Sequence, residues 1–387
     1  MKPALVGVSV TATQAVCQLA VVAITAKFLG VEQVGEFTLV NSILLLFTTA
    51  FSFGVREAYL IENDSFGFRT FGSLRLLGVG LCFLFSFVAV LAINTSLIVI
   101  FFPLAVFRLL TMYFDFQLAS YQFEKQYRRI LVSQIGRFGL STVVFGVSVF
   151  VVKDFSLQLW FYALSVVFIH MVIDLPVHLR SWKKDTTSLN IKECFLKCAP
   201  LSLSQLTTNI QNNSPRIFLG LFSNSAVLGL FAVVYQLFNM SSVAFTSALN
   251  FYLKKDDKLS LEQLPNLILI CFLLTLAGVS AWFLLGEMFL SLIFGDSYLE
   301  VYSIVLLLLC FLFLKFTGLS IQWMIMKTGR FLTLAKHQVA ISLISVGVGF
   351  VSIFYKGYDG ALFSVMFTSV FYAIYMSILL YKEHQNE

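Results

Sequence analysis

Charged residues are scarce in this chain of 387 residues, and their scarcity excludes an ordinary soluble domain. Only 12% of the residues are Asp, Glu, Lys or Arg, whereas 59% are apolar. A soluble fold needs polar groups over nearly half of its surface, and this composition cannot supply them. We therefore expect lipid to be the solvent for most of the chain.

Period-two alternation and long polar segments are missing as well. The apolar runs extend over about 20–28 residues without alternation, which excludes barrel strands and predicts membrane-spanning helices. Every polar connection is short, so no large soluble domain is expected. No cleavable signal peptide is expected either, because Met1-Lys2-Pro3 leads directly into a segment long enough to span.

Metal-binding and nucleic-acid-binding patterns are also lacking. The six cysteines are scattered, and although Cys194 and Cys198 share a helix face, no His lies near enough in sequence to complete a metal site. We predict no metal, no catalytic residue and no cofactor. The formal charge of +6 lies largely in short loops, as membrane orientation requires, and does not indicate nucleic-acid binding.

The apolar runs predict about twelve helices. Their expected ranges are Leu5–Leu29, Val34–Ile61, Gly72–Ile93, Leu97–Gln122, Ile130–Val152, Phe155–Leu179, Cys198–Phe222, Ala226–Leu253, Leu264–Leu285, Tyr298–Met326, Phe331–Phe354 and Gly360–Leu380. Pro200 and Pro265 are expected near helix starts, where a missing N–H group costs nothing.

The polar stretch from Arg180 to Lys197 divides the chain near its middle. It carries five basic residues and could not lie in hydrocarbon. We predict an amino-terminal six-helix bundle over residues 1–180, a cytoplasmic linker over 181–197 and a carboxy-terminal six-helix bundle over 198–387.

The two halves resemble each other. Phe28-Leu29-Gly30 and the following Gly35 have counterparts in Phe218-Leu219-Gly220 and Gly229, and the basic turn at Lys125 has one at Lys327. The offsets are 190, 194 and 202 residues, which increase as small insertions would make them. Because six is an even number, both halves enter the membrane from the same side. We predict a pseudo-two-fold axis along the membrane normal, a central cavity and alternating access.

Basic residues in the connections predict the orientation. With the amino terminus inside, the inner connections carry most of the Lys and Arg residues, whereas the outer ones carry little beyond Lys153 and Lys356. Both termini are therefore expected in the cytoplasm. The inner basic residues are Arg69, Lys125, Arg128, Arg129, Arg180, Lys183, Lys184, Lys192, Lys197, Lys254, Lys255, Lys258, Lys327 and Arg330.

Several ionisable residues fall inside the predicted spans. Arg108 and Lys315 lie near helix centres, where a charge costs roughly 2.5–3.5 kcal/mol and usually faces a cavity or a partner. Arg216 and Arg137 lie nearer helix ends, and Arg56 and Lys27 nearer still, where snorkelling is the simpler interpretation. Internal pairing is the alternative, for instance between Arg108 and Asp115, two turns further along the same helix.

Two acids and one polar helix complete the candidate set. Asp115 and Asp174 are the principal acids of the spans, and Asp174 follows His170 by one turn, so it could relay protons or pair with a loop lysine. The predicted seventh helix carries nine polar residues that face sugar hydroxyls or other helices. They are Ser202, Ser204, Gln205, Thr207, Thr208, Asn209, Gln211, Asn212 and Asn213.

Four stretches resemble polysaccharide flippases of the multidrug/oligosaccharidyl-lipid/polysaccharide exporter superfamily. They lie at Phe28–Ser42, Phe51–Ile61, Asn212–Leu237 and Leu292–Tyr298 (LIFGDSY). The chain is most similar to the O-antigen type, which exports oligosaccharides linked to undecaprenyl diphosphate. It departs from many relatives at Pro215, where they carry an acid before the arginine, which removes support for acid-dependent coupling at that position.

The resemblance implies a bacterial inner-membrane flippase for lipopolysaccharide assembly. Its substrate would be an undecaprenyl-diphosphate-linked oligosaccharide, its setting membrane lipid, its energy source an ion or proton gradient, and its partners a polysaccharide polymerase and chain-length proteins. Arginine binds diphosphate oxygens bidentately, so cations could line the cavity. The substrate-binding candidates are Arg108, Lys315, Arg216, Arg137, Arg56, Lys27, Asn209 and Asn212, and the coupling candidates are Asp115 and Asp174.

Two other functions stay open on the sequence. A small-molecule or drug cation antiporter of the same superfamily would need a net acidic site, whereas the mid-depth charges here are basic. A membrane-embedded polysaccharide polymerase or ligase would need a large outer loop or a nucleophile with its base, and the sequence offers neither.

Overall fold

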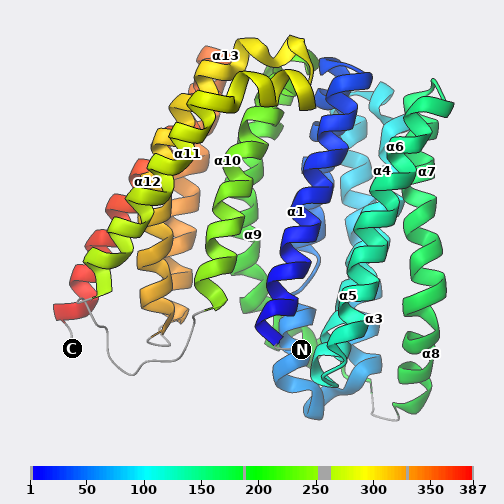
Figure 1. Ribbon diagram of the computed structural model, residues 1–387. Helices are drawn as coiled ribbons and strands as arrows, with labels where there is room; N and C mark the ends of the chain where they lie inside the picture. The colour runs from blue at the N-terminus through cyan, green and yellow to red at the C-terminus, as the bar shows by residue number, and fades with distance from the viewer. Residues whose placement is uncertain (1–2, 186–188, 252–262, 328–330, 386–387) are drawn as a thin grey trace. The chain divides into compact units, whose positions relative to one another are not determined.

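The computed structural model describes residues 3–185, 189–251, 263–327 and 331–385 (Figure 1). Nearly all of these residues are helical, and they contain no β-strand. The all-α class predicted from the composition is confirmed. The helices up to the middle of the chain are α1 (Pro3–Phe28), α2 (Val31–Ala50), α3 (Val55–Ile93), η1 (Thr95–Leu97), α4 (Ile98–Phe123), α5 (Tyr127–Gln134), η2 (Ile135–Leu140), α6 (Ser141–Val151), α7 (Phe155–Ile169), η3 (His170–Asp174) and α8 (Leu175–Lys184).

The remaining elements continue the same pattern of long helices joined by short turns. They are α9 (Ile191–Phe222), α10 (Ser225–Phe251), α11 (Leu264–Ile293), η5 (Asp296–Val301), α12 (Tyr302–Lys327) and α13 (Phe331–Gln385). The last of these is two helices that meet at a kink, where Gly357 has φ 53° and ψ −119°.

Helix packing divides the chain into two units. Unit 1 comprises Met1–Val21 and Glu36–Asn213, and unit 2 comprises Val22–Gly35 and Ser214–Glu387. The end of α1 and the start of α2 therefore belong to unit 2, while the rest of both helices belongs to unit 1. Helix α9 contributes to both units.

Helix α4 is the most deeply buried element of unit 1. It packs against α3 and α7, and α7 packs in turn against α6. A core cluster formed by aromatic residues of α3 and α4 also includes Cys194 and Cys198 of α9. These two thiols are buried in this largely apolar cluster.

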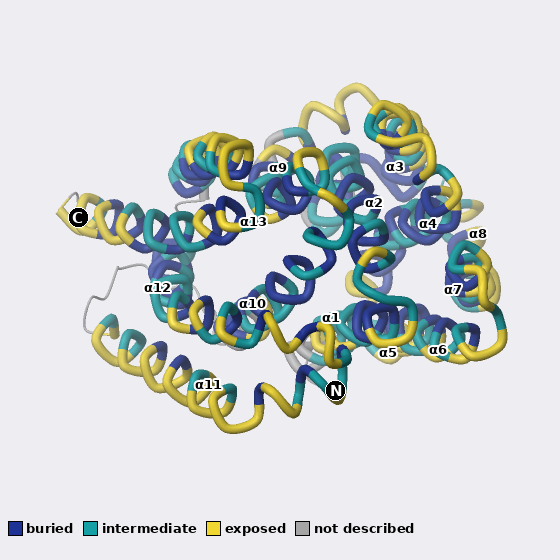
Figure 2. Tube along the Cα trace, turned by 90° about the horizontal axis from the view of Figure 1, so that it is seen from above, coloured by how far each residue is buried: buried dark blue, intermediate teal, exposed yellow. Residues whose placement is uncertain are grey.

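Unit 2 is built around α12, which packs against α10, α11 and α13. Helix α11 is exposed along most of its length (Figure 2). Its exposed apolar residues include Leu273, Phe283 and Leu284. In water such a surface would be costly, whereas against lipid tails it is the normal outer face of a membrane helix.

Ten helices of the described residues are long and apolar enough to cross a membrane. The last of them, Thr333–Gln385, has 53 residues and contains the kink at Gly357, so it amounts to two spans. Helix α9 falls outside the ten because of its polar residues, although its 32 residues are sufficient in length. With these two additions, the described residues contain the twelve long helices predicted.

Several predicted helix boundaries are wrong. Residues 62–71, expected as a connection that carries Arg69, belong to α3, and α11 extends to Ile293 rather than Leu285. The expected helix Val34–Ile61 is interrupted at residues 51–54, where Phe53 and Gly54 have positive φ angles of 53° and 60°. Helix α9 begins at Ile191, so Pro200 lies inside a helix rather than near its start. Pro265 does occupy the first turn of α11, as predicted. The predicted loop basic residues Lys254, Lys255, Lys258 and Arg330 lie outside the described residues.

Two glycines of the sequence repeat form a reciprocal contact within unit 2. A Cβ atom added at Gly35 would lie 1.8 Å from the carbonyl oxygen of Ser225, and one added at Gly229 would lie 2.0 Å from that of Val31. Both Val31 and Ser225, and Gly35 and Gly229, are 194 residues apart. The first turns of α2 and α10 are thus related by a local two-fold axis, and only glycine permits their backbones to approach so closely.

Candidate functional site

The cations of the spans fall into two groups according to their partners. Arg56, Arg75 and Arg137 pair with carboxylates, and these pairs are confined to unit 1. A second group, which we call the amide-held cations, consists of Arg108, Arg216 and Lys315. Each of the three donates to a side-chain amide oxygen and lies over an aromatic ring.

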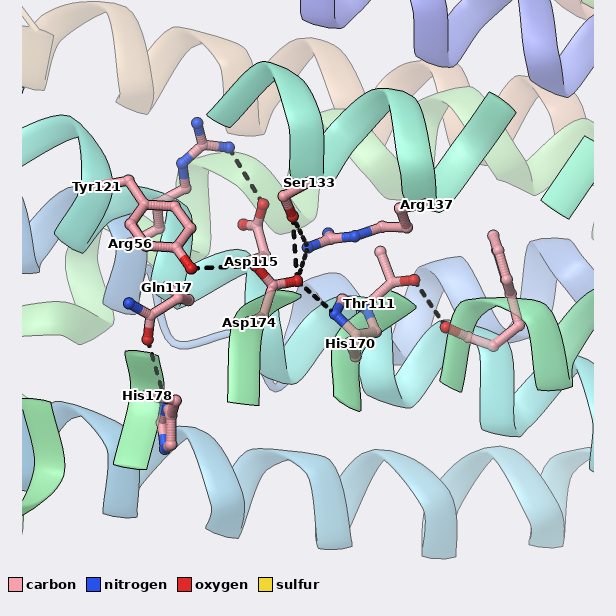
Figure 3. Close-up of polar contacts among 11 residues, drawn as sticks. Arg56, Thr111, Asp115, Gln117, Tyr121, Ser133, Arg137, His170, Asp174 and His178 are labelled. Atoms are coloured by element: carbon pink, nitrogen blue, oxygen red, sulfur yellow. Dashed lines mark hydrogen bonds and ion pairs between the residues drawn. The ribbon is translucent and has the colours of Figure 1, made fainter. Parts of the chain in front are cut away.

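Asp115 on α4 is the centre of the first carboxylate cluster. Its two oxygens lie 3.3 Å from Arg56 and 3.5 Å from Arg75, both on α3 (the Arg56 pair is drawn in Figure 3). Arg75 also donates to the carbonyl oxygens of Met112, at 2.8 Å, and Ser52, at 2.7 Å. Ser52 lies in the interruption between α2 and α3, and its carbonyl oxygen also accepts from the N–H of Val55 at 3.2 Å, so Arg75 adds a second hydrogen bond to this carbonyl.

Asp115 does not bridge to Arg108, as the seven-residue spacing suggested, because two arginines of α3 occupy it. Arg75 itself was not among the predicted site residues. It is only four residues into the predicted third helix, and a position so near a helix end favours an interfacial interpretation. Its burial is a result of packing against α4.

Asp174 is the centre of the second carboxylate cluster (Figure 3). One of its oxygens lies 2.7 Å from Nδ1 of His170, 3.0 Å from the hydroxyl of Ser133 and 3.6 Å from Nη2 of Arg137. The other accepts from the hydroxyl of Tyr121 at 3.3 Å. Asp174 and Arg137 are 0% and 1% exposed, so this is an interior network and not a pair with a loop lysine.

Both halves of this ion pair lie in π-helical turns. Arg137 belongs to η2 and Asp174 to η3, two short π-helices that interrupt otherwise α-helical spans. A π-turn inserts one extra residue and redirects the side chains around it, and it is found preferentially at functional sites. The polar cluster therefore coincides with two local departures from regular helix.

Arg108 on α4 is the first amide-held cation. Its Nε donates to Oδ1 of Asn41 on α2 at 2.8 Å, and its guanidinium carbon lies 5.2 Å from the centre of the Phe107 ring. The side chain is buried, and within the described residues no carboxylate forms an ion pair with it. Its positive charge is held only by neutral groups.

Arg216 and Lys315 repeat this arrangement in unit 2. Nη2 of Arg216 on α9 donates to Gln236 at 3.1 Å, and Nζ of Lys315 on α12 donates to Asn239 at 3.1 Å. The cations lie 4.6 Å and 4.5 Å from the ring centres of Tyr235 and Phe238 respectively.

All four of these partners come from one stretch of α10, residues 235–239. Neither Arg216 nor Lys315 has an ion pair among the residues that the structure describes.

The pairs of Arg108 and Lys315 correspond within the sequence repeat. In each half a cation on the fourth helix, α4 or α12, is held by an asparagine on the second, α2 or α10. Asn41 follows Gly35 by six residues and Asn239 follows Gly229 by ten, a difference of about one helical turn. The two asparagines therefore lie on equivalent faces of equivalent helices.

The remaining predicted residues are more dispersed. Lys27, at the end of α1, donates to the carbonyl oxygen of Leu292 near the end of α11, a typical contact of a lysine with a helix carboxy terminus. Asn209 on α9 donates to Thr49 of α2 at 2.7 Å and accepts from Asn213 at 2.7 Å.

Asn212, which lies between Asn209 and Asn213 in the sequence, is exposed. The polar helix is thus partly engaged in interhelical hydrogen bonds. Among the described residues, no group of three His, Cys, Asp or Glu side chains could hold a metal ion.

Comparison with solved structures defines the class of this fold. An inward-facing multidrug resistance MATE family transporter of the MOP superfamily superposes with a TM-score of 0.69 and 16% identity, over 100% of this chain and 99% of that one. The lipid II flippase MurJ in an inward closed conformation superposes with a TM-score of 0.73 and 11% identity, over 97% of this chain and 87% of that one. The protein is a multi-pass membrane protein with the fold of these transporters.

The family follows from the sequence match. Residues 2–253 match the family described as polysaccharide biosynthesis protein, and the chain belongs to this family. The relationship predicted from the four motifs is thereby confirmed. The capsular polysaccharide biosynthesis protein CapF of Staphylococcus aureus is 27% identical over 206 residues, which are 50% of this chain and 52% of that protein. The chain therefore spans about half the length of this curated relative in the match.

Proposed function

We propose that this protein moves oligosaccharides linked to undecaprenyl diphosphate from the inner to the outer leaflet of the bacterial cytoplasmic membrane, for surface polysaccharide assembly. Family membership and fold support a transporter acting on a polysaccharide precursor. The observation that carries the choice of substrate is the set of amide-held cations, whose charge no described carboxylate cancels.

A diphosphate is the chemical group that such cations suit. A cation near the centre of a membrane helix costs roughly 2.5–3.5 kcal/mol when it lacks an anionic partner. The diphosphate of the lipid carrier would supply that partner, with bidentate hydrogen bonds to arginine and a point-charge contact to lysine. Arg108 in unit 1, and Arg216 and Lys315 in unit 2, are therefore each proposed as a headgroup ligand within its own unit.

Other predicted ligands take lesser parts in the proposal. Asn212 would contact sugar hydroxyls. The amide of Asn209 would do the same after it exchanges its present partners, Thr49 and Asn213. Arg56 is half-exposed beside Asp115 and could meet the substrate at its edge, whereas the buried Arg137 and the helix-end Lys27 already have partners that a substrate would have to displace. The amide-held cations therefore remain the principal proposed ligands, and the residues of this paragraph are secondary ones.

Removal of the cations tests the proposal. Arg108→Ala and Lys315→Ala should each reduce surface glycan at least tenfold in a strain that depends on this protein, with unchanged protein level in the membrane. Arg108→Lys and Lys315→Arg should restore part of the display. The matched control is Lys153→Ala, which removes an exposed cation between α6 and α7. Full display in both alanine variants would contradict the proposal.

Asp115 and Asp174 are proposed to couple transport to an ion or proton gradient. Protonation of Asp174 would cancel the charge that holds Arg137, and the two π-turns that carry them could then repack. In reconstituted vesicles, transport should respond to an imposed pH or sodium gradient, and Asp174→Asn should abolish that response. An unchanged response in this variant would exclude Asp174.

The mechanism that we propose is alternating access between the two halves of the chain, residues 1–180 and 198–387, with both termini in the cytoplasm. A polysaccharide polymerase and chain-length proteins would consume the product on the outer side. The glycan class is also a proposal: the motifs favour O-antigen and hence lipopolysaccharide, whereas the Staphylococcus aureus relative is named for a capsular polysaccharide.

The cation-antiporter alternative would need a carboxylate available to a cationic drug. Asp115 and Asp174 are both engaged by arginine side chains. The two alternatives differ in a simple assay: deletion of an antiporter would sensitise cells to cationic dyes and leave the surface glycan unchanged.

A further inference from the structure

We propose that Asn41, Gln236 and Asn239 are positioning residues that hold the three cations without neutralising their charge. They thereby set the specificity for an anionic headgroup. This inference rests on the proposed function. The three residues contact the cations, and they are not proposed to contact the transported lipid.

The choice of an amide contrasts with the rest of the chain. Arg56, Arg75 and Arg137 are held by aspartates, in the ordinary way for cations inside a membrane protein. An asparagine has almost the same shape as an aspartate and accepts the same hydrogen bond, but it carries no charge. The three amides therefore supply geometry while the net charge of each site stays at plus one.

The same choice is made independently in both packing units. Asn41 holds Arg108 within unit 1, and Asn239 holds Lys315 within unit 2, on equivalent helices of the repeat. Gln236 adds a third instance one turn from Asn239 on α10. A neutral acceptor at three cations in two units indicates a common requirement, and not a local packing solution.

The aromatic neighbours serve the same end. Phe107, Tyr235 and Phe238 offer the negative face of a ring to a cation, which stabilises it without a formal charge. Amide and ring together reduce the cost of keeping the cation in the membrane. A diphosphate that arrives can then take over the cation, because a neutral acceptor competes far less strongly than a tethered carboxylate in a low-dielectric site.

An isosteric change that adds only charge tests this inference. Asn41→Asp, Asn239→Asp and Gln236→Glu would place a carboxylate where the amide is and convert each cation into an ion pair. We expect each to lower surface glycan and the affinity of the purified full-length protein for inorganic pyrophosphate by tenfold or more. The thermal unfolding midpoint should stay equal or rise, because a hydrogen bond is retained and an ion pair is gained.

The relative transport activities of two variants at Asn239 distinguish this role from a purely structural one. Asn239→Ala leaves Lys315 loosely held but still positively charged, so it should retain more transport than Asn239→Asp. A structural role predicts the reverse, since aspartate keeps the hydrogen bond and alanine loses it. Asn224→Asp is the matched control, because it makes the same chemical change at the cap of α10, where Asn224 accepts from the N–H of Val227.

Two results would overturn the inference. Wild-type transport and pyrophosphate binding in all three acidic variants, alongside inactive Arg108→Ala and Lys315→Ala variants, would refute the role of the amides and leave the proposed function standing. Wild-type transport in the alanine variants of the cations as well would refute both.

Discussion

Lys315 on α12 donates a hydrogen bond to the amide oxygen of Asn239 on α10, with 3.1 Å between the two atoms. Arg108 and Asn41 form the equivalent contact in the other half of the sequence repeat, at 2.8 Å. In both cases a cation within the membrane spans has a neutral acceptor as its partner. This relationship separates these cations from the arginines that aspartates neutralise, and it gives the substrate proposal its physical basis.

Removal of one partner of the buried pair between Arg137 and Asp174 should destabilise the protein, whereas replacement of both partners by apolar residues should not. Asp174→Ala leaves a buried guanidinium without its counter-charge, which should cost roughly 3–5 kcal/mol of folding free energy. The double variant Arg137→Met with Asp174→Leu should recover most of that loss. Thermal unfolding of the purified protein in detergent measures both, and a double variant as unstable as the single one would contradict the expectation.

Arg75 should stabilise the interruption between α2 and α3. Arg75→Met removes the donor to the carbonyl of Ser52 and one of the two partners of Asp115, so we expect a loss of roughly 1–3 kcal/mol. Thermal unfolding and limited proteolysis near residues 51–54 would detect it. Arg69→Met, a change of the same kind in the same helix but away from the interruption, should leave proteolysis at those residues unchanged.

The reciprocal glycine contact predicts strong sensitivity to a single methyl group. Gly35→Ala and Gly229→Ala each force α2 and α10 apart, because the new Cβ would fall on a backbone carbonyl. Both variants should show a clear loss of membrane-inserted protein or of thermal stability. Gly80→Ala and Gly278→Ala are the controls: a Cβ at either position meets nothing within 4 Å, and alanine favours a helix interior by roughly 1 kcal/mol.

The predicted orientation can be measured with single cysteines. With Cys17 and Cys310 replaced by alanine, an impermeant maleimide should label Lys153→Cys and Lys356→Cys in intact cells. Lys183→Cys should be labelled only after permeabilisation, because it lies in the basic segment expected in the cytoplasm. All three positions are exposed, so access to the reagent depends on the side of the membrane. Labelling in the opposite pattern would show that both termini lie outside.

Most of the fold could be predicted from the sequence because membrane helices are specified locally. A run of about 20 apolar residues must form a helix in lipid, whatever its neighbours are. The exceptions have local causes of another kind. The interruption at residues 51–54 places Phe53 in a left-handed conformation that hydrophobic periodicity does not predict. Helix α9 continues through Pro200, which the sequence places near a helix start.

The sequence by itself determined the membrane class, the twelve helices, the repeat and the presence of Arg108, Arg216 and Lys315 within the spans. Only the tertiary structure decided which cations are neutralised. Arg108 and Asp115 share a helix face two turns apart, yet Asp115 pairs with Arg56 and Arg75 of α3, and Arg108 with Asn41 of α2. Partners of this kind come from other helices, and their choice depends on how those helices pack, which no spacing along a single helix can specify.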